Sequence, residues 1–335
     1  MTLPPSPWPD GFERWIPDSE WVAAEVGELA RKYDSVENHG WYRNLEPTIR
    51  DLVPLLGDDA LWLDYSGGTG ILVDRLAHEL PDRRFGALLV DASPRFLRLA
   101  LEKLRSDPRV AFRWLRYRSG EKRLERLDEV LPGWLIRRGF EVLTSTNAIH
   151  LYYQMEATLR SWFEVVRPGG VVLVQSGNID NPDAPAGTWV IDETVERLQP
   201  LARKLVREDP KLAPLRVGLD DRQRQAAYDR LRRKFFLPIR PLAYYLDKLR
   251  EAGFEIAAVE ALPIEASVAE WRDFLAAYHE GVLGWAGGSA RIEGTDPAPE
   301  VVALRQELLD RALHALFEGG DDFRACWTYV RCRRP

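Results

Sequence analysis

A run of small residues at the end of an apolar segment carries the clearest chemical signal in this sequence. The apolar segment covers residues 60–65, and the small residues that follow it are Ser66, Gly67, Gly68, Thr69 and Gly70. Small residues let a ligand approach the backbone closely, and a helix that begins directly after them adds partial positive charge at its N-terminus. The pattern therefore predicts a ligand-binding turn between a strand and a helix.

Two acidic residues flank this turn and indicate what it binds. Asp91 ends the next apolar segment, 21 positions after Gly70, which is the spacing at which a carboxylate binds a ribose diol in a βαβ nucleotide site. Val73 stands where a dinucleotide-binding G-x-G-x-x-G turn needs its third glycine. Asp64, just before the turn, is unsuited to a pyrophosphate but suits a ligand with a positive ammonium group. Val73 and Asp64 therefore disfavour a dinucleotide as the ligand of this turn.

The turn resembles the first motif of the class I S-adenosylmethionine-dependent methyltransferases, which reads acidic-x-Gly-x-Gly-x-Gly. Asp64, Gly68 and Gly70 match this motif, and Ser66 replaces its first glycine. Residues 166–170 are similar to the turn before the family's fifth strand, and the tail from 254 to 332 is similar to its closing strand pair.

The resemblance implies S-adenosylmethionine as the cofactor, with Asp91 on its ribose hydroxyls and Asp64 near its amino acid moiety. N-terminal helices often cover the cofactor in this family, so Tyr42 and Arg43 are candidates for contacting its carboxylate. Tyr117 is a candidate for stacking on the adenine. The full set of expected cofactor contacts is Asp64, Ser66, Gly67, Gly68, Gly70, Asp91, Ala92, Asn147, Tyr42 and Arg43.

His150 is the candidate general base. It follows the fourth expected strand, and ligands of open α/β sheets bind beyond the carboxyl ends of the strands. A side chain with a pKa near 6.5 can take a proton from a hydroxyl acceptor. The segment is similar to that of small-molecule O-methyltransferases in which a His followed by Asp-Trp is the base, but Leu151 and Tyr152 stand in those places here. The alternative is a histidine with a structural hydrogen bond. Tyr152 and Tyr153 are candidates for lining the acceptor pocket.

Strands and helices alternate along residues 60–176, and this alternation predicts how the candidate residues are positioned. The expected strands are 60–65, 85–90, 109–115, 142–146 and 171–175, followed near the end of the chain by 254–262 and 323–332. Strands rich in Val and Leu that are separated by helices are typical of a parallel sheet buried on both faces. We therefore expect an α/β fold with a doubly wound, mostly parallel, seven-stranded sheet of the Rossmann-like methyltransferase type.

The expected organisation has four parts. Residues 1–57 form an N-terminal helical lid that includes a helix over 19–33, and residues 58–182 form the cofactor-binding core. Residues 183–236 form a helical insertion, and 237–335 complete the sheet with extra helices. The insertion follows the fifth strand, where an acceptor would approach, so we expect it to cap the acceptor pocket and exclude water.

The amino-acid composition indicates which classes of partner to expect. The net charge of −6 argues against nucleic acid, because neutralising phosphates requires an excess of Lys and Arg. The Pro-rich N-terminus is no signal peptide, and no stretch reaches the ~18 apolar residues of a membrane span. We expect a cytoplasmic location and no membrane partner. Cys326 and Cys332 are too few for a disulfide framework or a structural zinc site, so no metal is expected.

These observations predict methyl transfer from S-adenosylmethionine to a small-molecule acceptor by in-line displacement, with oxygen favoured over nitrogen or carbon. Two alternatives stay open: a nicotinamide-dependent oxidoreductase, and a non-catalytic methyltransferase-like protein that binds the nucleotide and acts through a partner. The identity of the acceptor does not follow from the fold. The oligomeric state is also open, and a homodimer is one of the possible states.

Overall fold

The computed structural model describes residues 4–16 and 40–335, so the expected helix over 19–33 lies outside the described residues. Seven strands form the main sheet, in the order β10-β11-β7-β6-β1-β2-β3. Their bounds are Leu61–Tyr65 (β1), Gly86–Asp91 (β2), Val110–Trp114 (β3), Phe140–Thr146 (β6), Val166–Ser176 (β7), Glu255–Ser267 (β10) and Asp322–Arg333 (β11). The first five of these pair in parallel, while β11 pairs antiparallel with both β7 and β10. The doubly wound, mostly parallel sheet of seven strands is confirmed.

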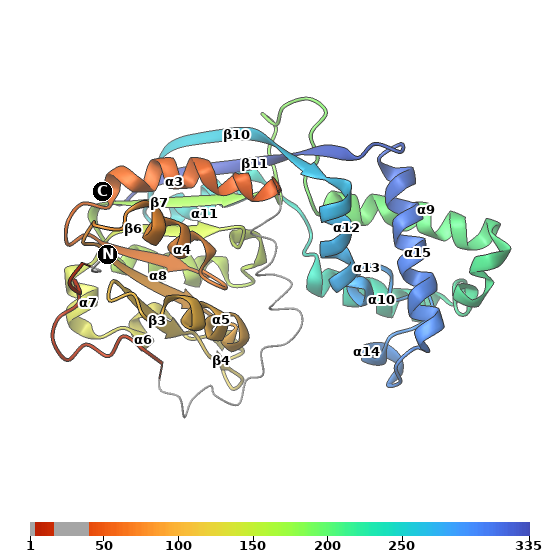
Figure 1. The fold of residues 1–335 in the computed structure, drawn as a ribbon, viewed down its shortest axis with the longest axis horizontal. Coiled ribbons are helices and arrows are strands. Elements are labelled where there is room, and N and C mark those ends of the chain that lie inside the picture. The colour runs from red at the N-terminus through yellow and green to blue at the C-terminus, as the bar shows by residue number, and fades with distance from the viewer. Residues whose placement is uncertain (1–3, 17–39) are drawn as a thin grey trace.

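Helices cover both faces of this sheet (Figure 1). One face packs against α3 (Glu46–Leu52), α4 (Ile71–Glu79) and α5 (Pro94–Leu104). The other face packs against α6 (Leu127–Val130), α7 (Gly133–Arg138), α8 (Met155–Val165) and α11 (Leu242–Glu251). Every residue of β1 and β2 is buried, because successive side chains point into the two opposite helical layers.

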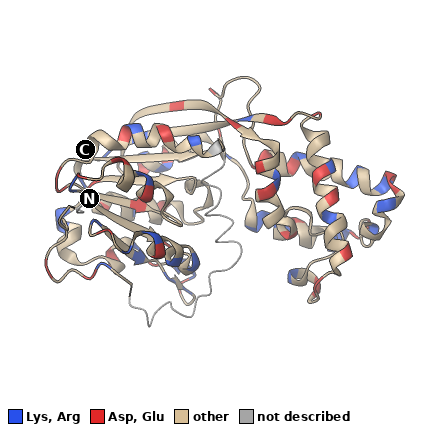
Figure 2. Cartoon of the chain, viewed as in Figure 1, with Lys and Arg blue, Asp and Glu red and all other residues tan. Residues whose placement is uncertain are grey.

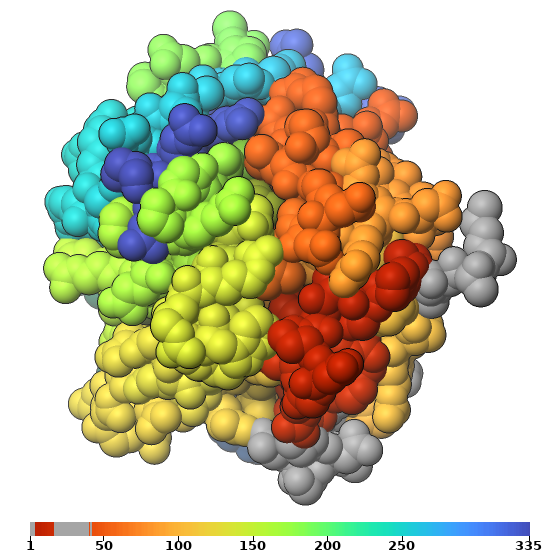
Figure 3. All heavy atoms as spheres, turned by 90° about the vertical axis from the view of Figure 1, so that its left-hand side faces the viewer, coloured from red at the N-terminus to blue at the C-terminus, as the bar shows by residue number. Residues whose placement is uncertain are grey.

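The N-terminal segment 4–16 contains no helix, while residues 40–55 of the expected N-terminal lid are helical, in η2 (Gly40–Leu45), α3 and η3 (Val53–Leu55). Its prolines fix φ and lack backbone donors, which opposes helix formation. The segment instead runs along β3 at the edge of the sheet: Phe112 N donates to Arg14 O, and Trp8 Nε1 donates to Arg109 O, both at 2.8 Å. Figure 3 shows it in red between the orange and yellow parts of the chain. It therefore shields an edge strand that would otherwise expose unpaired backbone groups.

A second, helical lobe lies beside the sheet (Figure 1). It comprises α9 (Glu193–Glu208), η5 (Pro210–Arg216), α10 (Arg222–Phe235), α12 (Val268–Ala277), α13 (His279–Leu283), α14 (Ala290–Glu293) and α15 (Pro299–Leu316). Acidic and basic residues are interspersed along these helices in Figure 2, with no segregation of one sign. No helix in residues 4–16 and 40–335 is both long and apolar enough to cross a membrane.

The lobe is larger than the insertion expected at 183–236, because helices from residues 268–316 join it. The apolar side of α9, which includes Val195 and Leu198, is buried in one cluster with Leu308 and Leu309 of α15. An amphipathic helix must bury its apolar side against another element, but the pattern does not say against which one. The sequence therefore predicted the helices but not their association.

Four short strands complete the fold. β4 (Tyr117–Arg118) and β5 (Arg123–Leu124) form a hairpin after β3, while β8 (Ile179–Asp180) and β9 (Arg240–Pro241) pair in parallel. The chain enters the lobe directly after β7 and β8, so the lobe stands at the carboxyl ends of the parallel strands. In open α/β sheets this is the side on which ligands bind.

Candidate functional site

The turn between β1 and α4 has a backbone that only small residues fit. Ser66, Gly68 and Gly70 have positive φ values of 60°, 58° and 80°. A Cβ atom at Gly67 would lie 2.6 Å from the Asp64 carboxylate, and one at Gly70 would lie 2.8 Å from the side chain of Leu104. Real Cβ atoms essentially never come this close to another atom, so the close packing of the turn requires glycine at both positions.

Asp64 lies under this turn and is fully buried. Its Oδ1 atom accepts a hydrogen bond from Thr144 Oγ1 at 2.7 Å, and Thr144 Oγ1 accepts one from Trp62 Nε1 at 2.7 Å. Its Oδ2 atom has no hydrogen-bond partner among the described residues. Burial raises the pKa of Asp64 to about 7. A buried carboxylate oxygen without a partner favours a positively charged ligand group nearby.

Asp91, at the end of β2, ties the turn to the neighbouring strand. Its Oδ2 atom accepts a hydrogen bond from Gly68 N at 2.9 Å, and its Oδ1 atom accepts one from Ser93 N at 2.7 Å. Burial raises the pKa of Asp91, although these backbone hydrogen bonds oppose the rise. Each carboxylate oxygen has a second lone pair. Asp91 can therefore hold the turn in place and still accept hydrogen bonds from a diol.

A cavity of about 630 Å³ opens beside the turn, and we call it the glycine-turn cavity. Its walls come from the ends of β1, β2 and β3, from the β4–β5 hairpin and from the start of α8 and include Tyr65, Ser66, Ala92, Leu115, Tyr117, Leu124, Leu151, Tyr152 and Tyr153. Tyr152 Oη donates to Ser66 Oγ at 3.0 Å. Tyr152 and Tyr153, which we considered for the acceptor pocket, line this cavity instead, together with Tyr117.

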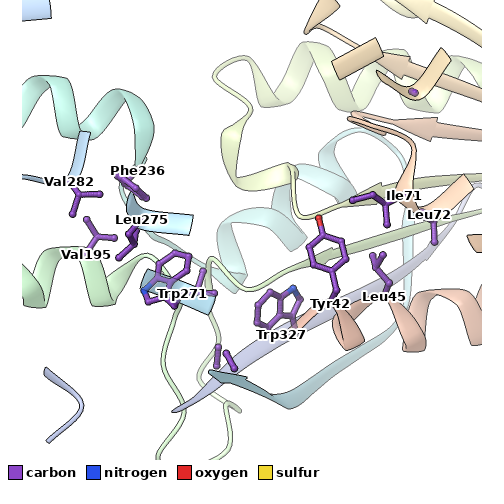
Figure 4. Close-up of a cluster of buried hydrophobic side chains, with 14 of the residues drawn as sticks. Tyr42, Leu45, Ile71, Leu72, Val195, Phe236, Trp271, Leu275, Val282 and Trp327 are labelled. Carbon is purple, nitrogen blue, oxygen red and sulfur yellow. The ribbon is translucent and has the colours of Figure 1, made fainter. Parts of the chain in front are cut away.

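A second cavity, of about 150 Å³, lies between the sheet and the lobe, and we call it the lobe pocket. It is lined by Tyr42, Asn147, His150, Leu151, Gly177, Asn178, Ile191, Asp192, Phe235, Phe236, Trp271, Phe274, Tyr278 and Trp327. Figure 4 shows Tyr42 and Trp327 on the sheet side, with Trp271 and Phe236 on the lobe side. Leu151 lines both this pocket and the glycine-turn cavity, so the two cavities adjoin.

His150 lies on the single-turn helix η4 (Ile149–Leu151), and protein groups contact both of its ring nitrogens. Nδ1 is 2.9 Å from Ser176 Oγ, and Nε2 is 3.1 Å from Asn178 Nδ2. Asn178 Oδ1 accepts from Asp192 N at 2.8 Å, so its amide NH₂ group faces the imidazole. Nε2 is therefore the acceptor and Nδ1 carries the hydrogen. Burial lowers the pKa of His150 to about 4, which keeps the ring neutral at pH 7.

Residues 63–172, which include the turn, Asp91 and His150, match the family model described as "Methyltransferase domain". The chain carries a class I methyltransferase domain. Its methyl donor is S-adenosylmethionine, and the glycine turn, the carboxylate of Asp91 and the unpartnered Asp64 oxygen fit this molecule. The nicotinamide alternative is not favoured.

The solved structures similar to this chain have low sequence identity to it. A methyltransferase from Geobacter sulfurreducens in complex with S-adenosyl-L-homocysteine is 14% identical, with a TM-score of 0.47 and coverage of 91% of this chain and 98% of that chain. Phosphoethanolamine N-methyltransferase 2 from Haemonchus contortus, in complex with S-adenosyl-L-methionine, is 14% identical, with a TM-score of 0.48 and coverage of 98% and 61% respectively. No curated protein matches the chain.

The other expected cofactor contacts fall in different places in this methyltransferase. Asn147 lies in the lobe pocket, where its Oδ1 atom accepts from Trp327 Nε1 at 2.7 Å and its Nδ2 atom donates to Asn44 Oδ1 at 3.3 Å. Tyr42 is buried in the same pocket, whereas the adjacent Arg43 is exposed and lines neither cavity. The structure brings Tyr42 and Asn147 together and leaves Arg43 outside.

Sequence reasoning missed Asp192, Asn178 and the aromatic residues of the lobe pocket. Asp192 directly precedes α9 and reads as a helix cap, but its side chain makes no capping hydrogen bond. Trp271 reads as an ordinary apolar residue of an amphipathic helix. These residues come together only because the lobe folds back on the carboxyl ends of the strands, and no motif encodes that approach.

Proposed function

We propose that this methyltransferase binds S-adenosylmethionine in the glycine-turn cavity and methylates a small molecule bound in the lobe pocket. The observation that carries the proposal is the shared wall at Leu151, which places the two cavities side by side. A pocket of about 150 Å³ is the size of a cavity that holds a benzene-sized molecule, so it suits a small acceptor or one group of a larger one.

The residues that would hold the methyl donor follow from the turn. Asp91 would accept hydrogen bonds from its ribose hydroxyls, Asp64 would face its ammonium group, and Ala92 would contact the adenine side. When bound, S-adenosylmethionine supplies a methyl group on a positively charged sulfur, which becomes neutral as the methyl leaves. The task of this chain is then to align the acceptor and exclude water, since both raise the rate of a displacement.

We favour an oxygen acceptor with His150 as its base. The neutral imidazole is already in the form that accepts a proton, and its Nε2 lone pair points at Asn178 Nδ2. An acceptor hydroxyl would have to replace that amide to reach Nε2 within one hydrogen bond. The lobe, including residues 191–192 and 235–236, would act as the cap that encloses the reaction. We place the reaction in the cytoplasm on the sequence evidence alone.

Calorimetry with S-adenosylhomocysteine tests the cofactor site. We expect Asp91→Ala to bind roughly 10- to 100-fold more weakly, because hydrogen bonds to a charged group are worth about 1.5–3 kcal/mol. The control is Asp220→Ala, which removes a carboxylate that is 90% exposed in the lobe. Unchanged affinity in a folded Asp91→Ala protein, or tight binding of NAD, would contradict the proposal. Binding without methyl transfer to any of a panel of phenols, carboxylates and amines would favour the non-catalytic alternative.

A further inference from the structure

The lobe pocket has a distinctive wall. Seven of its fourteen lining residues are aromatic, namely Tyr42, Phe235, Phe236, Trp271, Phe274, Tyr278 and Trp327. Asp192 is the one lining residue with an acidic side chain, and no lining residue is Lys or Arg. Since His150 stays neutral, the wall offers a negative charge and aromatic rings, and no positive charge. Such a wall disfavours an anionic ligand.

Asp192 is buried, with only 8% of its surface exposed. No ion pair joins it to a residue in the described ranges 4–16 and 40–335, and the charge of Glu196, which has the same sign, raises its pKa further. Its backbone N–H donates to Asn178 Oδ1 at 2.8 Å. A buried carboxylate is costly unless a positive charge pairs with it. Burial accordingly raises the pKa of Asp192 to about 7, and a cation beside the carboxylate would stabilise its ionised form.

Aromatic rings attract organic cations through their electron-rich faces, and the attraction is strongest when water is excluded. The rings of the lobe pocket come from both the sheet and the lobe: Tyr42 and Trp327 lie on the sheet side, and Trp271 lies on the lobe side (Figure 4). A cation between them would be enclosed by rings on several sides and face one carboxylate. Recognition of quaternary ammonium ligands uses this combination.

We propose that the lobe pocket recognises an ammonium or quaternary ammonium group of the methyl acceptor, with Asp192 as its counter-charge and the surrounding rings as its cage. This inference rests on the proposed function for the statement that the occupant is the acceptor. The preference for a cation depends only on the wall of the pocket. The pocket volume of about 150 Å³ accommodates a group of trimethylammonium size.

Two probes of the same shape and different charge test the proposal. Choline carries a quaternary nitrogen, and 3,3-dimethyl-1-butanol has a carbon in its place. We would measure the binding of each by calorimetry to the full chain saturated with S-adenosylhomocysteine. We expect choline to bind at least tenfold more tightly than the neutral alcohol. Equal binding of the two probes, or no binding of choline, would overturn the proposal, even if no variant folded.

Variants then identify the groups responsible. Asp192→Asn keeps the shape of the side chain, and we expect it to weaken choline at least tenfold without changing binding of the neutral alcohol. Phe236→Leu should also weaken choline, because it removes one ring from the cage. Asp220→Asn, an exposed carboxylate of the same lobe, is the matched control and should change neither. Choline binding that is unaffected by Asp192→Asn in a protein with the parent's melting temperature would refute the role of Asp192.

The arrangement of the assay separates this inference from the proposed function. If S-adenosylhomocysteine itself failed to bind, the cofactor site would be wrong. If it bound and choline displaced it, the pocket would belong to the positive groups of the cofactor, and the acceptor proposal would be overturned. A ternary complex of protein, S-adenosylhomocysteine and choline is the expected result.

Discussion

Replacing Asp64 by Asn should separate the stability of the fold from the binding of the methyl donor. The Asn side chain has the same shape, its Oδ1 atom can still accept from Thr144, and its Nδ2 atom takes the place of the unpartnered Oδ2. The buried charge disappears in the variant. We expect Asp64→Asn to gain stability above pH 7 and to lose affinity for S-adenosylhomocysteine.

The magnitude follows from the pKa of Asp64, which burial raises from an ordinary value of 3.8 to about 7. Between these two values the folded protein keeps a proton that the unfolded chain has released. The parent therefore loses stability as the pH rises from about 4 to about 7. The full loss is about 4 kcal/mol, because each tenfold change in proton affinity is worth about 1.4 kcal/mol. Asn does not titrate, so the variant should gain up to this amount relative to the parent over the same window.

Urea unfolding at pH 5 and pH 8, followed by tryptophan fluorescence, measures the difference in stability, and calorimetry at pH 8 measures binding of S-adenosylhomocysteine. We expect the variant to bind roughly 10- to 100-fold more weakly, because a hydrogen bond to a charged group is worth about 1.5–3 kcal/mol. Asp192→Asn is the matched control: burial gives Asp192 a similar pKa of about 7, but we expect no effect on the nucleotide. A stability difference that does not change with pH would refute the argument from burial, and unchanged affinity would refute the role of Asp64 in binding.

Substitutions at three further positions probe other parts of the molecule. We expect Ser66→Gly to change the free energy of unfolding by less than about 1 kcal/mol, because relief of the positive φ offsets the lost hydrogen bond and the added flexibility of Gly. Ser66→Val keeps the unfavourable φ and should lower the free energy of unfolding by about 1–2 kcal/mol. Equal urea midpoints for the two variants would contradict this. Arg109→Met leaves the buried Asp107 without its partner and should cost about 3–5 kcal/mol, which a melting temperature equal to the parent's would disprove. If His150 is the base, His150→Gln should lower turnover roughly 10²- to 10⁴-fold. The rate of the parent should be flat from pH 6 to 8, because the pKa of His150 is about 4. Full turnover in the folded variant would refute the role of His150 as the base.

The cofactor half of the site could be predicted from the sequence because its residues belong to one contiguous unit. Strand β1, the glycine turn and α4 follow one another directly, and Asp91 ends the next strand. Parallel strands bring their carboxyl ends to one edge of the sheet, so order along the chain determines proximity in space. The same logic placed His150 at that edge.

The proposed acceptor pocket could not be predicted in this way. Asp192 and Trp271 lie on different elements of the lobe, and the pocket also needs Trp327 from the last strand. Their proximity depends on how the helices of two separate segments pack, which is a property of complementary apolar surfaces and not of local pattern.

Asn178 connects the two halves of the acceptor site. The backbone N–H of Asp192, where the first lobe helix begins, donates to Asn178 Oδ1 and so turns its amide NH₂ toward His150 Nε2. That contact in turn leaves the hydrogen of the ring on Nδ1, facing Ser176. A hydroxyl acceptor at Nε2 would have to replace this amide, whereas a cation would pair with the Asp192 carboxylate. A molecule with both a hydroxyl and a cationic group would satisfy the base and the counter-charge at once, whereas a simple phenol or a simple amine would satisfy only one of them.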